Sequence, residues 1–424
     1  MNRLNGLNYM RPARNYDKFI WFLTVLTITF FQIFNETENS SRSIILVTVV
    51  LAFAMFMDNK YKLNLQITYF HISIFLFVLF CYASSVWALD PVVSRTFATT
   101  ILSSLLCFSV YFEAFKSDSS VDRLLKAVMW SGPIVAVYTI LYFGYDEFVD
   151  MMNNSIRVEN DFANANTLGM WMAICLSLFV FYILREGFKW RYLTAVLLVV
   201  IIAFSQSRTA LIEAFVGSAL VAFFTIQKEK HGKRIIKYIL VIVVGIVAIN
   251  VISQLDIFKG LFQRMQGLEG FLSDDSVVNI DSSARTREIY IQLGWAQFLQ
   301  TPIGGIGIGN TYFITQLYHG STYLHNNYIE LLAAGGILGF GLYYSIYVYL
   351  FINLGRDAIK HKNIYSEICC IMLAINLVAD VGTVSYYKKQ NIFLLMICFL
   401  QVYINAKKQN DETPLNKESV LVQQ

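Results

Sequence analysis

The segment from Arg285 to Gly339 holds most of the residues that could do chemistry. It contains two arginines, Arg285 and Arg287, a glycine-rich turn over residues 304–310, and the run Leu324-His325-Asn326-Asn327. Guanidinium groups and a permissive glycine backbone can bind phosphate, and an imidazole can move protons near neutral pH. The segment therefore indicates a site that holds a phosphate and transfers a proton.

Each of these features also has an ordinary explanation when it is taken alone. The arginines would be solvated loop charges, the glycines a plain turn, and His325 an interfacial residue. An apolar stretch that contains Gly335, Gly336 and Gly339 follows without a break. The polar residues therefore lie directly against a predicted membrane span.

A further arginine, Arg208, stands between two apolar runs in Ser205-Gln206-Ser207-Arg208-Thr209. An arginine where two helices meet the lipid headgroups is costly unless an anion accompanies it. It would either clamp a phosphate or pyrophosphate or extend to ordinary headgroups, and the residues leave both open. Because arginine forks match pairs of pyrophosphate oxygens, Arg208 with Arg287, and Arg285 as a neighbour, would suit a lipid-linked pyrophosphate sugar.

His325 would either accept a proton from a sugar hydroxyl or donate a hydrogen bond to phosphate. The sequence contains no Walker A loop, HExxH zinc motif, paired-cysteine metal site or dinucleotide-binding motif. We therefore expect neither a metal nor a cofactor. Other polar residues near predicted span ends would bind sugar hydroxyls or serve as helix caps, namely Arg157, Asn164, Asn166, Asp380 and Tyr386.

The composition indicates which kind of scaffold must position these residues. The chain has 424 residues, of which 56% are hydrophobic and only 15% charged, and its mean hydropathy is +0.52. So few charges cannot cover a water-facing globule, which indicates an integral membrane protein. All six cysteines lie in apolar runs, so the sequence shows no disulfide framework or zinc-binding spacing. The modest net charge of +4 argues against a nucleic-acid surface.

About twelve apolar stretches are long enough to cross about 30 Å of hydrocarbon as helices. We expect an all-α polytopic membrane protein with one membrane domain over residues 1–408 and a disordered tail over residues 409–424. Its largest loop, residues 253–325, would lie outside and contain short helices. The predicted spans are 19–35, 43–57, 65–86, 96–114, 125–144, 165–184, 191–206, 209–227, 235–252, 326–354, 365–384 and 391–404.

Lysines and arginines fall in alternate loops, for example around residues 116–126, 185–191, 228–234 and 356–362. Loops that stay in the cytoplasm retain positive charge, so we expect both termini to be cytoplasmic. In the large outer loop, helical spacing predicts a surface helix over residues 256–272 and a second helix over 285–300. The second helix would pack inward through Ile289, Leu293, Trp295, Ala296 and Leu299.

The pair His325-Asn326 is followed after nine residues by Gly336 and after two more by Gly339. In this spacing the chain resembles the bacterial O-antigen ligase and O-antigen or capsule polymerase family. Two other segments, Ser205–Leu211 and Arg287–Asn310, are similar to that family as well. The resemblance covers about residues 200–345.

The resemblance implies a GT-C-like glycosyltransferase in the bacterial inner membrane. It would act at the outer face on an undecaprenyl-pyrophosphate-linked oligosaccharide and an acceptor glycan. Its expected partners are membrane lipids, a flippase and chain-length regulator proteins. It implies that Arg208 and Arg287 hold the pyrophosphate and that His325 assists attack by the acceptor hydroxyl with inversion. Arg285 matches less well, and Asn326 and Arg157 are expected to bind substrate.

Ligases and polymerases share these motifs and differ in the acceptor, which is a lipid A-core sugar or another repeat unit. The segments Tyr323–Leu332 and Asp380–Tyr386 are more similar to repeat-unit polymerases. A lipid-linked oligosaccharide flippase, from a different class, would also have about twelve spans. Such folds are commonly built from internal repeats with sites near the membrane midplane, whereas the polar candidates here gather at one face.

Overall fold

The computed structural model describes residues 15–34, 39–58, 66–153, 159–160, 163–254, 282–316, 318 and 323–412. In these ranges the regular structure is helical, apart from two short antiparallel strands that pair Glu159 with Asn164. The predicted surface helix over residues 256–272 lies outside the described residues. The elements are α1 (Asn15–Ile33), α2 (Asn39–Asp58), α3 (Tyr69–Ser84), α4 (Pro91–Phe115), α5 (Asp122–Phe143), α6 (Tyr145–Asn153), β1 (Glu159–Asn160), β2 (Ala163–Asn164), α7 (Ala165–Glu186), η1 (Trp190–Thr194), α8 (Ala195–Ser205), α9 (Arg208–Gln227), α10 (His231–Gln254), α12 (Ser282–Gln300), α13 (Tyr312–Thr315), α14 (Asn327–Lys360), α15 (Ile364–Ala379) and α16 (Lys389–Glu412).

The predicted spans coincide with helices of the structure. Six described helices are long and apolar enough to cross a membrane, namely α4, α5, α7, α9, α14 and α16. Shorter apolar stretches occur in α2, α3, η1–α8 and α15, and the remaining predicted spans match α1 and α10. The prediction of an all-α polytopic membrane protein is confirmed. Helix α16 continues through Glu412, four residues beyond the predicted end of the membrane domain.

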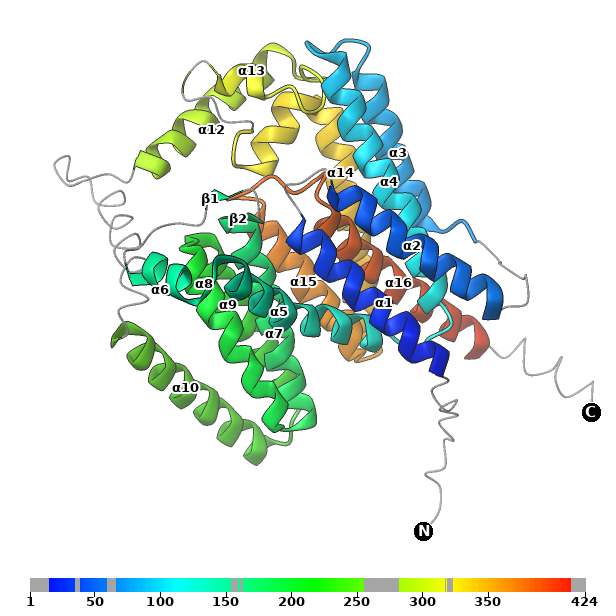
Figure 1. Cartoon of the computed structure of the whole chain (residues 1–424). Helices are drawn as coiled ribbons and strands as arrows, with labels where there is room; N and C mark the ends of the chain where they lie inside the picture. Colours follow the sequence, from blue (N-terminus) through cyan, green and yellow to red (C-terminus); the bar gives the residue numbers. More distant parts are fainter. Residues whose placement is uncertain are drawn as a thin grey trace, which may run out of the picture.

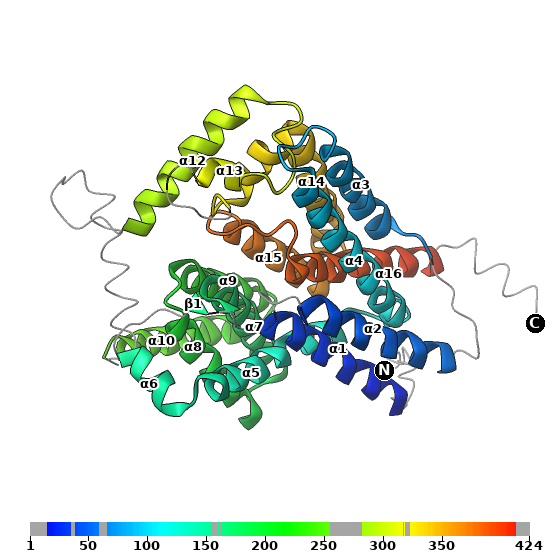
Figure 2. The same ribbon diagram turned by 45° about the horizontal axis from the view of Figure 1, so that its top comes forward.

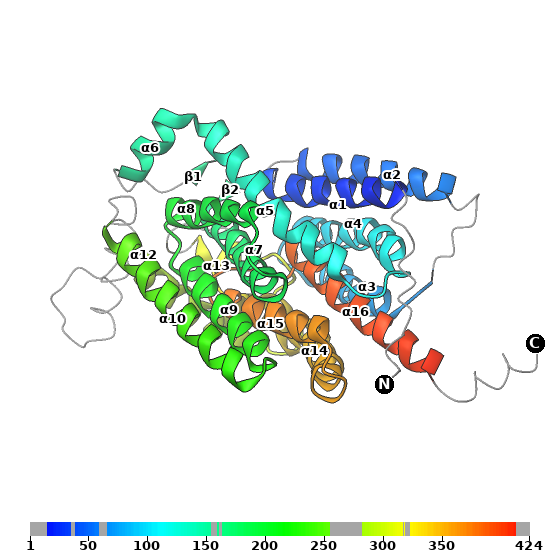
Figure 3. The ribbon, with the colours of Figure 1, turned by 90° about the horizontal axis from the view of Figure 1, so that it is seen from below.

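The helices form two connected groups (Figure 1). In one group α7 packs against α5, α8 and α9, and in the other α3, α4 and α14 surround α16. Helix α15 contacts α7, α9, α14 and α16 and so joins the groups. Viewed from below, α1 and α2 lie along one edge, while α10 lies on the outside of α9 (Figure 3).

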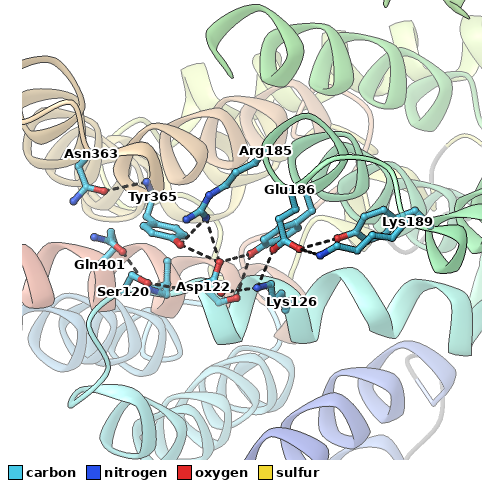
Figure 4. A network of polar contacts seen from close by, with 12 residues as sticks. Ser120, Asp122, Lys126, Arg185, Glu186, Lys189, Asn363, Tyr365 and Gln401 are labelled. Atoms are coloured by element: carbon cyan, nitrogen blue, oxygen red, sulfur yellow. Dashed lines mark hydrogen bonds and ion pairs between the residues drawn. The ribbon is translucent and has the colours of Figure 1, made fainter. Parts of the chain in front are cut away.

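The helix ends that carry the basic clusters meet at one face, here called the basic face. Asp122 at the start of α5 accepts hydrogen bonds from Arg185 of α7 and Tyr365 of α15, at 3.4 and 3.0 Å (Figure 4). Lys228, just after α9, forms an ion pair with Glu367 of α15. The clusters that alternate along the sequence therefore share one side of the protein, as the loop pattern predicted.

The opposite helix ends form what we call the site face, where α7, α9, α14 and α16 begin and α15 ends. Lys388, just before α16, donates a hydrogen bond of 2.8 Å to Thr167 in the first turn of α7. Helices α12 and α13 lie at this face near the start of α14 (Figures 1 and 2). The site face therefore carries the only described helices that come from the large loop.

The predicted helix over residues 285–300 is confirmed as α12, which begins three residues earlier, at Ser282. The prediction of its inward face is only partly correct: Leu293 packs against a buried cluster that includes Tyr290 and Leu324, but Trp295 and Leu299 are 47% and 62% exposed. Tyr290 and Gly294, four residues apart, face the rest of the protein instead. Tyr290 is 1% exposed, and a Cβ on Gly294 would lie 2.7 Å from a methyl group of Leu324.

Helix α14 is kinked at Gly336, where φ is 59° and ψ is −164°. The turn over residues 302–309 fits against the kink, and Gly307 N–H donates to the Ala334 carbonyl at 2.9 Å. A Cβ on Gly336 would lie only 2.3 Å from the Ile303 carbonyl oxygen. The glycines of both segments are therefore needed because two backbones meet there.

Replacing Gly336 with alanine should lower the free energy of unfolding by about 3 kcal/mol or more, because of positive-φ strain and the backbone overlap. Gly341→Ala in the same helix is the matched control, since a Cβ there would have no atom within 4 Å. It should change stability by less than about 0.5 kcal/mol. Thermal unfolding in detergent would measure both, and equal effects would contradict this account of the kink.

Candidate active site

His325 lies in a strained turn immediately before α14. Its φ of +56° is in the left-handed region, which costs free energy for a residue other than glycine. Its ring stacks on Tyr290 of α12 at 6.2 Å with an interplanar angle of 3°, and Tyr323 lies 4.3 Å away on centroids. The imidazole is thus held between aromatic rings, and it remains partly exposed at the site face.

Asn326 and Asn327 fix the turn that carries His325. Asn326 is the N-cap of α14, and its side-chain oxygen accepts hydrogen bonds from Tyr328 N–H and Ile329 N–H at 3.0 and 3.1 Å. Its amide nitrogen donates to the Val381 carbonyl at 3.3 Å. We expected Asn326 to bind substrate, but both the oxygen and the nitrogen of its side-chain amide form hydrogen bonds within the protein.

Residues 380–386, which we call the platform loop, receive this turn. Asn327 is fully buried and accepts hydrogen bonds from Ser385 N–H and Tyr386 N–H at 2.9 and 3.2 Å. Its amide nitrogen donates to the Asp380 carboxylate at 3.2 Å, and its backbone N–H donates to the Asp380 carbonyl at 2.8 Å. One asparagine thus connects the start of α14 to the loop between α15 and α16.

Asp380 is itself fully buried within the platform loop. Burial raises the pKa of its carboxyl to about 7, although hydrogen bonds donated by Ser385, Tyr344 and Asn327 favour the carboxylate. The folded protein therefore binds this proton more tightly than the unfolded chain does. The contribution of Asp380 to stability is greatest below about pH 4 and decreases as the pH rises to about 7.

The start of α9, where Arg208 lies, contacts the same platform loop. The hairpin between α8 and α9 is very short, because Gln206 adopts a left-handed conformation with φ of +48° and Ser207 caps α9. A Cβ on Gly382 would lie 2.6 Å from the Thr209 hydroxyl oxygen, so the start of α9 touches the loop that binds Asn326. Arg208, the residue before Thr209, therefore lies beside the loop that supports His325.

Arg287 and Arg285 lie on opposite sides of α12. Arg287 is one turn before Tyr290 and shares its face, whereas Arg285 is two positions from Arg287, a rotation of about 200° around the helix. Arg287 is half-buried and Arg285 is exposed. The structure thus brings Arg287 toward the ring that stacks on His325, and it turns Arg285 away.

The glycine-rich turn uses its own N–H groups within the protein. Gly305 donates to the Thr301 carbonyl at 3.0 Å, and Ile308 donates to the Ser84 hydroxyl at 3.2 Å. The turn therefore packs against α14 as a plain structural turn. These N–H groups are already bonded within the protein and are not available to bind phosphate.

Sequence reasoning missed two buried carboxylates. Glu330, in the first turn of α14, accepts hydrogen bonds from Leu324 N–H at 2.9 Å and from the Thr311 hydroxyl, and so fixes the residue before His325. Glu213 lies one turn deeper in α9 than Thr209 and lines a cavity of about 50 Å³. The signal for Glu213 was available, because an acidic residue inside an apolar span is rare.

The other predicted residues have varied outcomes. Arg157 lies outside the described residues. Asn164 is the N-cap of α7, as its alternative explanation proposed, and its amide nitrogen lies 3.4 Å from the Tyr323 hydroxyl. Among the described residues there is no group of three or more histidine, cysteine, aspartate or glutamate side chains that could hold a metal ion.

Replacing Asn327 with alanine should lower the free energy of unfolding by about 3 kcal/mol, since two buried N–H groups of the platform loop would lose their acceptor. It should also reduce any activity that needs His325, because the turn before α14 would lose its support. Ser345→Ala is a suitable control, since this exposed hydroxyl bonds only within its own helix. Thermal unfolding would decide, and a stable N327A protein would show that the platform loop folds without it.

These features define the class: a polytopic helical membrane protein with arginines and a histidine at the helix ends of one face. A model of the O-antigen ligase family matches residues 193–344, from η1 into α14. This match supports the O-antigen ligase and polymerase family, as the sequence resemblance indicated. The matched segment contains Arg208, Arg287 and His325. A search of curated proteins found no match to the chain.

Proposed function

We propose that the protein is a polymerase of O-antigen or capsule repeat units. The donor would be a polyprenyl-pyrophosphate-linked oligosaccharide and the acceptor a sugar hydroxyl of another such glycan. The family supports an O-antigen ligase or polymerase type of glycosyltransferase. The observation that carries the proposal is that α9 and the turn before α14 meet on one platform loop, while α12 packs on that turn through the Tyr290–His325 stack.

In this proposal the acceptor hydroxyl oxygen forms a bond to the anomeric carbon of the donor sugar. The bond between that carbon and the phosphate oxygen breaks, and its electron pair leaves with the polyprenyl pyrophosphate. His325 takes the hydroxyl proton, and Arg208 and Arg287 stabilise the charge that grows on the pyrophosphate. The attack from the face opposite the leaving group inverts the anomeric carbon.

The basic face is proposed to be cytoplasmic and the site face to lie outside the inner membrane, because loops rich in lysine and arginine stay in the cytoplasm. Cysteines introduced singly at exposed positions would test this. Phe313→Cys at the site face should react with an impermeant thiol reagent in whole cells, and Lys360→Cys at the basic face should react only after lysis. The reverse pattern would invert the topology.

Purified protein supplied only with a lipid-linked repeat unit tests the reaction itself. Growth of a ladder of longer glycans would support the polymerase. The family model is described as O-antigen ligase, so the second candidate is transfer to a lipid A-core acceptor. Product that forms only when core lipid is added would establish the ligase, and no product with movement of the substrate across a vesicle membrane would indicate a flippase.

A further inference from the structure

A second candidate site lies at the basic face, at the opposite helix ends from His325. A cavity of about 370 Å³ opens there between α3, α14 and α16. Its walls include the aromatic rings of Tyr69 and Tyr349, whose centroids are 5.2 Å apart, and the apolar side chains of Phe399 and Val402. An amphipathic ligand would fit such a lining, because aromatic residues favour the membrane interface.

The available charge of the cavity is positive. Arg356 lines it, is exposed, and has no ion pair among the residues that the structure describes. Its guanidinium donates only to the Asn353 side chain, at 3.3 Å. Asp357 also lines the cavity, but it is 3% exposed, and its oxygens accept hydrogen bonds from Asn405 and Gln409 at 2.7 and 3.1 Å. A guanidinium at the membrane boundary therefore has room for an anion.

The surface next to the cavity is apolar along the helices toward the membrane interior. On α3, Ile72 and Leu76 are 47% and 49% exposed, and on α14, Val348 and Ile352 are 57% and 62% exposed. Val348, Ile352 and Arg356 are spaced by four residues and so lie on one side of α14. A ligand here would have an anionic head beside Arg356 and apolar chains along α3 and α14.

We propose that this cavity binds the headgroup of an anionic phospholipid, with its phosphate against Arg356. A free phosphate ion offers the same oxygen atoms to a guanidinium but cannot use the apolar surfaces. The apolar stripe therefore favours the lipid as the source of the phosphate. This site is separate from the proposed transferase site and does not depend on it.

Native mass spectrometry of the purified full chain would test the proposal with three probes: phosphatidylglycerol, phosphatidylcholine and inorganic phosphate. The wild-type protein should retain phosphatidylglycerol in preference to phosphatidylcholine. Arg356→Gln should reduce the retained phosphatidylglycerol about fivefold, the effect of one basic residue at a membrane surface. Arg356→Lys, which keeps the charge, should retain more of this lipid than Arg356→Gln.

Lys360→Gln is the matched control, because Lys360 is exposed one turn further along α14 and does not line the cavity. It should leave lipid retention unchanged. Equal losses from R356Q and K360Q, or equal retention of the two lipids, would overturn the proposal. Inorganic phosphate that displaced phosphatidylglycerol at equal concentration would also overturn it, since the apolar chains would then contribute nothing. Glycan transfer by R356Q reports separately on the site at His325.

Discussion

Replacing His325 with alanine should lower the rate of glycan chain growth at least about 100-fold, the usual contribution of a positioned acid or base. The imidazole would no longer accept the hydroxyl proton, while its neighbours would still hold the turn through Asn326 and Asn327. The variant should therefore accumulate at a normal level. The measurement is the glycan ladder formed from lipid-linked repeat unit by equal amounts of purified protein.

His361→Ala is the control for this experiment, because His361 is an exposed histidine at the other end of α14, on the basic face. It should produce ladders of wild-type length. Near wild-type ladders from H325A would remove His325 from the chemistry. The pH dependence separates the two roles of the imidazole. A base must be neutral, so the rate should fall as the pH is lowered, whereas a cationic phosphate ligand would give the opposite trend.

Replacing Arg287 with glutamine should lower the rate about 100-fold, since one donor to the developing pyrophosphate charge would be lost. Arg285→Gln should change the rate less than about twofold, because Arg285 points away from Tyr290 and His325 on the other side of α12. The two variants make the same chemical change two residues apart in one helix. Initial rates at saturating donor would compare them directly.

Arg287→Lys adds a second comparison, since lysine keeps the charge but cannot bind two phosphate oxygens in a fork. We expect it to retain part of the activity that R287Q loses. Equal losses from R285Q and R287Q would mean that the orientation of α12 does not select the arginine. In that case the helix would act only as a source of positive charge.

Much of the scaffold could be predicted because hydrophobic burial leaves a local pattern in the sequence. Each predicted span matched a helix, and the alternation of basic loops matched the shared basic face. The inward side of α12 was predicted only in part, because Leu293 packs inward whereas Trp295 and Leu299 are apolar yet exposed. At a membrane surface an apolar side chain can face lipid, so hydrophobicity alone does not identify the side that packs on protein.

The sequence by itself determined the class of protein, the helical scaffold and the candidate residues Arg208, Arg287 and His325, since membrane spans and short motifs are encoded by neighbouring residues. Only the tertiary structure decided that the side of α12 with Tyr290 and Arg287, and not the side with Arg285, packs toward His325, and that the glycine-rich turn packs on the kink at Gly336. It alone showed that Asn327 joins α14 to residues 380–386. These features depend on hydrogen bonds and backbone contacts between segments far apart in the chain, such as the bond of 2.9 Å between Ser385 and Asn327. No spacing along the sequence records such a contact.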